Sequence, residues 1–189
     1  MSIRKRSIVI MGLKHCGKTT QGKKIAAKLE LPFFDTDYVI EKLTGMSARE
    51  LYSTKGVAAF MQAEEEACSK IIKQVDNKPA VISTGGGICD NAPALNILRS
   101  CEDFIFLRND INDSISRITD KITEPVPGYF ENLPAYIAAE KPQSMSDIKK
   151  ILAARFNERF AKYEHIADII IDIKNAPIDD NFKTILGAL

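Results

Sequence analysis

Apolar residues along the chain form short β-branched runs that alternate with longer stretches in which apolar positions recur every three or four residues. The short runs have the length and composition of buried parallel strands, and they lie at 7–11, 33–34, 80–83, 103–107 and 168–173. The longer stretches predict helices at 18–29, 38–43, 47–55, 58–75, 92–99, 110–122, 146–163 and 179–186. Strands that alternate with helices predict an α/β fold with a parallel sheet covered on both faces.

Local signals mark several boundaries of these elements. Ser47 and Glu50 have the spacing of a capping box, so a helix should begin at Ser47, and Gly56 should separate it from the next helix. The periodicity stops at 123–144, which holds four prolines. A loop of this length in a compact domain is typical of a lid or of a disordered segment, and we expect a lid at about 121–146.

A glycine-rich motif follows the first predicted strand and opens the first predicted helix. Gly12, Gly17, Lys18 and Thr19 match the phosphate-loop pattern in the strand and helix setting that this pattern requires. Glycine permits backbone angles that turn successive N–H groups toward a phosphate, and the helix N-terminus adds a positive dipole. The motif predicts nucleotide contacts along the loop, from Gly12, Lys14, His15, Cys16, Gly17, Lys18, Thr19 and Thr20.

Two further strands end in residues suited to a site. Asp35 and Asp37 end the second strand, and Gly85, Gly86 and Gly87 follow the third. Taken alone, the aspartates also suit a solvated turn, and the glycines a flexible loop. Ligands of open α/β sheets bind beyond the carboxyl ends of the strands, so we expect the phosphate loop, the aspartates and the glycines to form one site.

Length and composition restrict the remaining possibilities. A chain of 189 residues with 45% hydrophobic content suits a single domain over 1–189. The 26 basic and 25 acidic residues leave a net charge of +1, which favours neither a nucleic acid nor a membrane partner. The cysteines show no C-x-x-C spacing, and the first residues lack the apolar segment of a signal peptide, so we expect a cytoplasmic protein.

Together these residues resemble the shikimate kinases, which belong to the nucleoside-monophosphate-kinase-like branch of phosphate-loop proteins. The likeness covers about 8–172 and includes the phosphate loop, the aspartates, the glycine triplet, Arg117 and Arg159. It implies a three-layer kinase fold with a five-stranded parallel sheet in the order 2-3-1-4-5. It also implies transfer of the γ-phosphoryl group of ATP, with Mg²⁺, to a ring hydroxyl of shikimate in aromatic amino acid biosynthesis.

The resemblance assigns a role to individual residues. It implies that Lys18 contacts the phosphates, that Thr19 and Asp35 serve Mg²⁺, and that Arg117 lies against the adenine. Lys18 and Asp37 would be the catalytic residues, with Asp37 at the acceptor hydroxyls. The acceptor would be bound by Asp37, Met61, Gly85, Gly86, Gly87 and Arg159, the last of these at its carboxylate.

The chain departs from the family pattern at two arginines. Met61 replaces the arginine that would grip the carboxylate beside Arg159, and Glu124 replaces an arginine of the lid. Lys121 or Lys141 is a candidate to supply the absent lid charge. Three readings follow: a divergent shikimate kinase, a kinase of another small hydroxylated metabolite, or a nucleotide-binding relative with little transfer activity. For each we expect a monomer with a small-molecule ligand.

Overall fold

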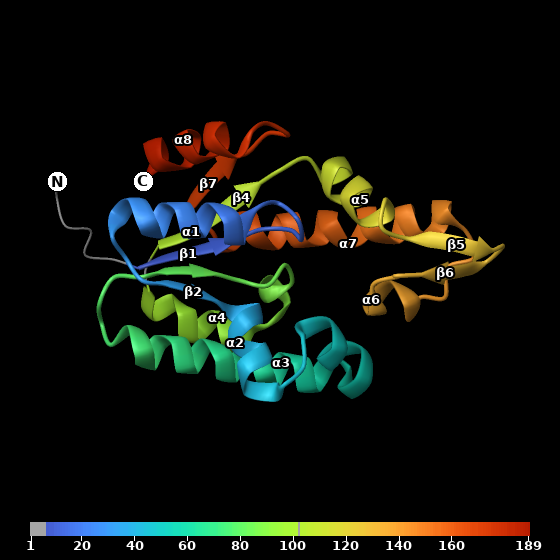
Figure 1. Ribbon diagram of the computed structural model, residues 1–189, viewed down its shortest axis with the longest axis horizontal. Coiled ribbons are helices and arrows are strands. Elements are labelled where there is room, and N and C mark those ends of the chain that lie inside the picture. The colour runs from blue at the N-terminus through green and yellow to red at the C-terminus, as the bar shows by residue number, and fades with distance from the viewer. Residues whose placement is uncertain (1–6, 102) are drawn as a thin grey trace.

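The computed structural model describes residues 7–101 and 103–189 (Figure 1). Residues 1–6, on which the expectation about a signal peptide depends, lie outside the described part. Five parallel strands form the central sheet in the order β2-β3-β1-β4-β7. They are β1 (Ile8–Met11), β2 (Phe33–Asp35), β3 (Val81–Ser83), β4 (Asp103–Arg108) and β7 (Ile169–Asp172). Since β7 is the fifth strand of this sheet along the chain, the expected order is confirmed.

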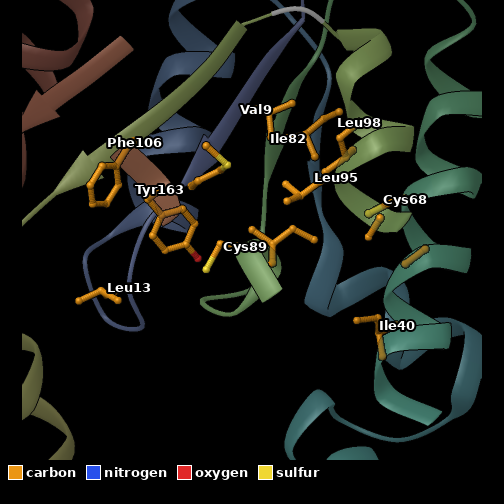
Figure 2. Packing of buried hydrophobic residues seen from close by; sticks show 14 of the residues in the cluster. Val9, Leu13, Ile40, Cys68, Ile82, Cys89, Leu95, Leu98, Phe106 and Tyr163 are labelled. Atoms are coloured by element: carbon orange, nitrogen blue, oxygen red, sulfur yellow. The ribbon is translucent and has the colours of Figure 1, made fainter. Parts of the chain in front are cut away.

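Alternate residues of β1 belong to two separate apolar clusters, which makes the fold three layers deep. Ile8 and Ile10 pack with α1 (Lys18–Leu29) and α8 (Ile178–Ala188). Val9 and Met11 point to the other face, where the larger cluster is built by α2 (Thr36–Thr44), α3 (Ala48–Val75), α4 (Ala92–Leu98), α5 (Ile111–Thr119) and α7 (Met145–Ile166) (Figures 1 and 2). Helices therefore cover both faces of the sheet, as the alternation of patterns predicts.

Aromatic rings fix α7 against β4. The ring of Phe106 stacks on Tyr163 with centroids 5.1 Å apart (Figure 2). It also meets the ring of Phe160 edge-on, with centroids 5.2 Å apart. Both Phe106 and Tyr163 are fully buried. Such pairs add to the free energy that comes from burying their surface. They hold the turn of α7 that carries Arg159 in one position relative to the sheet.

Most predicted boundaries are confirmed, and α2, α5, α7 and α8 each differ from expectation by two or three residues at one end. The capping box at Ser47 is present, and Gly56 adopts a non-helical conformation with φ 85° inside α3. Helix α2 begins at Thr36, two residues earlier than predicted, because the Asp35 carboxylate accepts hydrogen bonds from the N–H groups of Asp37 and Tyr38. Helix α5 ends at Thr119 rather than 122, although Ile122 remains buried.

The predicted lid contains regular structure, which its sequence pattern did not indicate. Strands β5 (Thr123–Val126) and β6 (Tyr129–Glu131) form an antiparallel hairpin, and a short helix, α6 (Ala135–Ala138), follows. Proline is tolerated in β5 because this strand has only one neighbour. Gly128 has φ 79°, and its N–H donates to Glu124 Oε1 at 2.8 Å, which closes the turn. The hairpin projects from the end of the molecule beyond α5 (Figure 1).

Along the described ranges 7–101 and 103–189, no helix is both long enough and apolar enough to cross a membrane.

Candidate active site

The register of the strands brings three loops to one edge of the sheet. Asp35 lies opposite Ser83, and Ser83 lies opposite Ile10, so the ends of β2, β3 and β1 are level. Beyond them the Thr84 N–H donates to the Ile10 carbonyl at 3.1 Å, and the Gly85 N–H donates to Thr36 Oγ1 at 3.0 Å. The phosphate loop, the aspartates and the glycine triplet are therefore neighbours, as predicted.

Glycine is required at the start of the phosphate loop. Gly12 has φ 148°, and a Cβ there would lie 2.7 Å from the Leu107 carbonyl oxygen and 2.8 Å from Cys16 Sγ. Gly17, with φ 95°, precedes the first turn of α1. The Lys18 ammonium group is held by the loop itself, because Nζ donates to the carbonyls of Gly12 at 3.0 Å and Leu13 at 2.8 Å.

Positive charge converges on this loop. Burial and the charges of Lys121, Lys14, Lys18 and Arg117 lower the pKa of His15 to about 4. Lys121 Nζ lies 3.4 Å from His15 Nε2, and Arg117 Nη1 donates to the His15 carbonyl at 2.6 Å. Burial and neighbouring cations, Arg49 first among them, also lower the pKa of Lys14. The same positive charge that lowers these two pKa values attracts anions, so the loop is suited to a polyanion such as a nucleotide phosphate chain.

Two oxygen ligands suited to Mg²⁺ lie together beside the loop. Thr19 Oγ1 on α1 donates to Asp35 Oδ2 at 2.7 Å. No cluster of three or more His, Cys, Asp or Glu side chains suited to a metal occurs within the described residues. Mg²⁺ in kinases is commonly held by one or two protein oxygens together with water and substrate phosphates, so this pair fits Mg²⁺ carried by a nucleotide.

A hollow of about 140 Å³ lies beside the phosphate loop, between α1, α5 and the segment after β7. Arg117 lines it and donates through Nη2 to Asn175 Oδ1 at 3.0 Å. Gln21 and Asn109 also line it, and each has a buried amide oxygen that accepts no hydrogen bond from the described part of the chain. The position suits the base of a nucleotide whose phosphates lie in the loop.

Each glycine of the triplet has a different polar neighbour. A Cβ added to Gly85 would lie 2.9 Å from Asp37 Oδ1. A Cβ on Gly86 would lie 2.8 Å from the backbone nitrogen of Lys14, and one on Gly87 would lie 3.0 Å from Arg159 Nη2. Contacts this short exclude a larger side chain without displacement. The triplet therefore joins the phosphate loop to Asp37 and Arg159, which come from α2 and α7.

Asp37 lies in the first turn of α2 with its residue open to solvent on one side. The protein crowded around its carboxylate reduces solvation and, with the charge of Asp35, raises the pKa of Asp37, while Lys18 and Lys14 act in the opposite direction. A carboxylate whose basicity is raised beside a phosphate site suits the role of proton acceptor.

Two of the groups that hold Arg159, Asp90 and Tyr136, were not identified by the sequence pattern. Its Nε donates to Asp90 Oδ2 at 3.0 Å, its Nη1 donates to the Gly86 carbonyl at 3.1 Å, and the ring of Tyr136 lies 5.7 Å from its Cζ. Lys162 Nζ donates to the other oxygen of Asp90 at 2.6 Å. Asp90 and Tyr136 are distant from Arg159 along the chain, so only the fold reveals them.

The two positions that depart from the arginine pattern have separate surroundings. Met61 is half-buried on α3, and its carbonyl accepts a hydrogen bond from Asn91 Nδ2 at 2.9 Å. The Glu124 carboxylate accepts a hydrogen bond from the Gly128 N–H in the turn of the hairpin. Both lysines considered for the lid charge are exposed, and of the two it is Lys121 that contacts the phosphate loop, at His15.

Fold and site together define a phosphate-loop kinase, in which we expect a nucleotide side around Lys18 and Arg117 and an acceptor side around Asp37 and Arg159. The sequence model of the shikimate kinase family matches residues 14–189. The chain therefore belongs to the shikimate kinase family and is a small-molecule kinase.

Individual relatives agree with this assignment. A shikimate kinase from Enterococcus faecalis is 29% identical over 183 residues, which cover 97% of this chain and 98% of that protein. A shikimate kinase from Mesorhizobium japonicum is 35% identical over 121 residues, or 64% of this chain, and the match spans only 58% of that longer protein. The structure of the Acinetobacter baumannii shikimate kinase in complex with shikimate has 26% identity and a TM-score of 0.70, with 96% of this chain and 90% of that chain covered.

Proposed function

We propose that this protein transfers the γ-phosphoryl group of ATP to a ring hydroxyl of shikimate and forms shikimate 3-phosphate. The glycine triplet carries the proposal, because it touches the phosphate loop at Lys14 and the acceptor residues at Asp37 and Arg159. A donor phosphate and an acceptor hydroxyl would thus be held across one short stretch of backbone. The related enzyme whose structure contains shikimate supports the choice of acceptor.

The chain's own residues divide the work of binding. Lys18 and Lys14 would hold the phosphates, with the remaining loop contacts from Gly12, His15, Cys16, Gly17, Thr19 and Thr20. Thr19 and Asp35 would hold Mg²⁺, which when bound neutralises charge on the phosphates. Arg117 would contact the base, and Arg159 the carboxylate of the acceptor.

The transfer itself requires little covalent participation by the protein. A bond forms between the acceptor oxygen and the γ-phosphorus, the bond to the bridging oxygen breaks, and ADP leaves. Asp37 would orient the acceptor hydroxyl and take its proton, a contribution of roughly 10²–10⁴ in rate. Positioning and charge neutralisation supply most of the remainder.

Met61 is the observation that favours a different hydroxylated acceptor. It brings no charge to the acceptor side, where a carboxylate bound by two guanidinium groups would need a second arginine. A kinase of another small hydroxy acid or polyol, with Met61 as part of an apolar wall, is therefore the second candidate. In either case we expect a cytoplasmic monomer of one domain.

A coupled assay of ADP release, with shikimate and a panel of hydroxy acids and polyols, tests the proposal. We expect shikimate to be the best acceptor, and Asp37→Asn to lower turnover by roughly 10²–10⁴ while ADP affinity stays unchanged. Asp76→Asn at the end of α3 is the control, because Asp76 has φ 47°, which asparagine adopts readily. Faster transfer to another acceptor would favour the second candidate, and no transfer to any acceptor would favour a nucleotide-binding relative.

A further inference from the structure

Arg159 shares the carboxylate of Asp90 with a second cation, Lys162. Arg159 Nε donates to Asp90 Oδ2 at 3.0 Å, and Lys162 Nζ donates to Asp90 Oδ1 at 2.6 Å, so each oxygen has its own partner. The two cations lie three residues apart on α7, a spacing that places them on one face of the helix. Two positive side chains and one negative side chain leave this cluster with a net positive charge.

The cluster runs from the site out to solvent. The side chain of Arg159 is 13% exposed, that of Asp90 29% and that of Lys162 48%, so the arginine is the innermost of the three. Its bonds to Asp90 and to the Gly86 carbonyl use two of the five N–H groups of a guanidinium. The other three, on Nη1 and Nη2, donate to no described residue, and Nη2 lies beside Gly87. They are the groups with which Arg159 can bind an anion.

Pairing with Asp90 alone would weaken Arg159 as an anion site. A carboxylate in contact with a guanidinium cancels its charge and repels a second carboxylate that approaches it. Lys162 changes this balance, because its ammonium group contacts the same carboxylate from the solvent side. Burial acts to raise the pKa of Asp90, but the hydrogen bond from Lys162 and the charge of Arg159 lower it below its usual value.

Glu64 on α3 is another carboxyl group on which the charge of Arg159 acts. The residue is 1% exposed, and its Oε2 accepts a hydrogen bond from Asn91 Nδ2 at 3.0 Å. Its Oε1 lies 3.2 Å from where a Cβ on Gly85 would be, and it accepts no hydrogen bond from residues 7–101 or 103–189. Burial raises the pKa of Glu64 to about 7. Below that pH Glu64 is mostly neutral, so Asp90 is then the carboxylate that competes with a ligand for Arg159.

We propose that Lys162 neutralises Asp90 and thereby keeps the positive charge of Arg159 free for the carboxylate of the acceptor. Asp90 and Lys162 are then positioning residues, because Asp90 fixes the guanidinium through Nε while Lys162 offsets the negative charge that this contact introduces. The inference rests on the proposed function, in which Arg159 binds the acceptor carboxylate. It gives the site a preference for acceptors with one negative charge, since such a ligand makes the whole cluster neutral.

Calorimetry without ATP tests this role, with shikimate and its uncharged methyl ester as ligands. A pH of 6 keeps Glu64 mostly protonated. We expect Lys162→Met, which keeps an apolar side chain and removes the charge, to weaken shikimate binding roughly three- to tenfold and to leave binding of the ester unchanged. Lys162→Arg should restore the affinity for shikimate. Lys149→Met, at another exposed lysine of α7, is the matched control and should change neither affinity.

The double variant Asp90→Asn with Lys162→Met separates charge balance from a direct contact. It removes one negative and one positive charge, and the asparagine oxygen can still accept from Arg159 Nε. We expect shikimate affinity to return to within about twofold of wild type. No recovery would overturn the inference, because Lys162 would then act by touching the acceptor itself. Equal shikimate affinity in wild type and Lys162→Met, or an equal loss toward shikimate and the ester, would overturn it as well.

If the double variant fails to fold, Lys162→Glu decides. It places a second negative charge beside Asp90, so shikimate should bind more weakly than to Lys162→Met while the ester binds as before, and equal affinities of the two variants for shikimate would contradict the role. Because binding is measured without transfer, tight shikimate binding with no turnover would contradict the proposed function and leave the test of Lys162 intact.

Discussion

At the scale of single residues, the acceptor side depends on three glycines, because they carry no side chain. Gly85, Gly86 and Gly87 let two carboxylates, the phosphate loop and a guanidinium group approach one stretch of backbone. Alanine at Gly86 would press against the backbone of Lys14 at 2.8 Å, which a side chain cannot relieve by rotating away. The triplet is thus a steric requirement of the site rather than a source of flexibility.

The buried carboxyl of Glu64 predicts a pH dependence of stability. Its pKa of about 7 lies above the ordinary 4.5, so the stability it contributes is present below pH 4.5 and is lost as the pH rises through 7. Burial is the main cause, with Asp37 and Asp90 adding to it and the bond from Asn91 and the charge of Arg159 opposing it. We expect wild type to lose up to about 3 kcal/mol of unfolding free energy, relative to Glu64→Gln, between pH 5 and pH 8.

Denaturant unfolding of both proteins across that range measures the effect. Comparison with Glu64→Gln removes the contributions of all other titrating groups. Parallel curves for the two proteins would show that Glu64 is not the source of the pH dependence.

At the scale of elements, contacts at both ends of the segment after α5 fix its position. Lys121, just before β5, contacts His15 in the phosphate loop, while Tyr136 on α6 faces Arg155 and Arg159 on α7. The hairpin between them has its own closing bond at Glu124. This segment thus spans from His15 in the phosphate loop to Arg159 on α7, and we propose that it is the lid expected from the sequence.

The contact at His15 predicts that Lys121 supplies positive charge to the transferred phosphoryl group. We expect Lys121→Met to lower kcat by roughly tenfold to a hundredfold, with little change in the KM for shikimate, because charge that develops in the transition state is stabilised selectively. Lys141→Met is the control, since Lys141 is an exposed lysine of the same segment, as Lys121 is, and only Lys121 of the two contacts His15. Steady-state kinetics with both substrates varied measures these constants. A loss of turnover in the Lys141 variant alone would contradict the role of Lys121.

At the scale of the whole molecule, the phosphate loop connects nucleotide binding to global stability. It joins β1, the central strand of the sheet, to α1. Residues of β1 belong to the buried clusters on both faces, and residues of α1 belong to one of these clusters. A ligand bound there at one hundred times its Kd should stabilise the folded chain by about 2.7 kcal/mol. For a domain of this size, that corresponds to a rise in Tm of roughly 5–10 °C.

We therefore expect Mg·ADP to raise the Tm of wild type and Lys18→Ala to lose most of this rise. Lys28→Ala, in the exposed last turn of α1, should keep the full shift and serves as the control. Differential scanning fluorimetry with increasing ADP makes the comparison. A full shift in the Lys18 variant would contradict the assignment of the loop.

The sequence by itself determined the features whose physical causes are local. Residues 12–19 specify the phosphate loop because glycine conformations and a helix start act over a few positions, and the apolar periodicity specifies strands, helices and their parallel arrangement. The alternation of strands and helices also predicted that Asp35, Asp37 and the glycine triplet lie at one edge of the sheet. Even the start of α3 could be predicted, because its capping box lies within four residues.

Only the tertiary structure decided which distant side chains meet. The unpaired oxygen of Glu64 beside Gly85, the pairing of Arg159 with Asp90 and the contact of Lys121 with His15 join residues separated by at least twenty positions. The hairpin in the expected lid escaped prediction because prolines obscure a short exposed strand, and its closing bond uses a side chain that carries no turn signal of its own. Periodicity reports which face of an element is buried, whereas the partner of a polar group depends on how the elements pack.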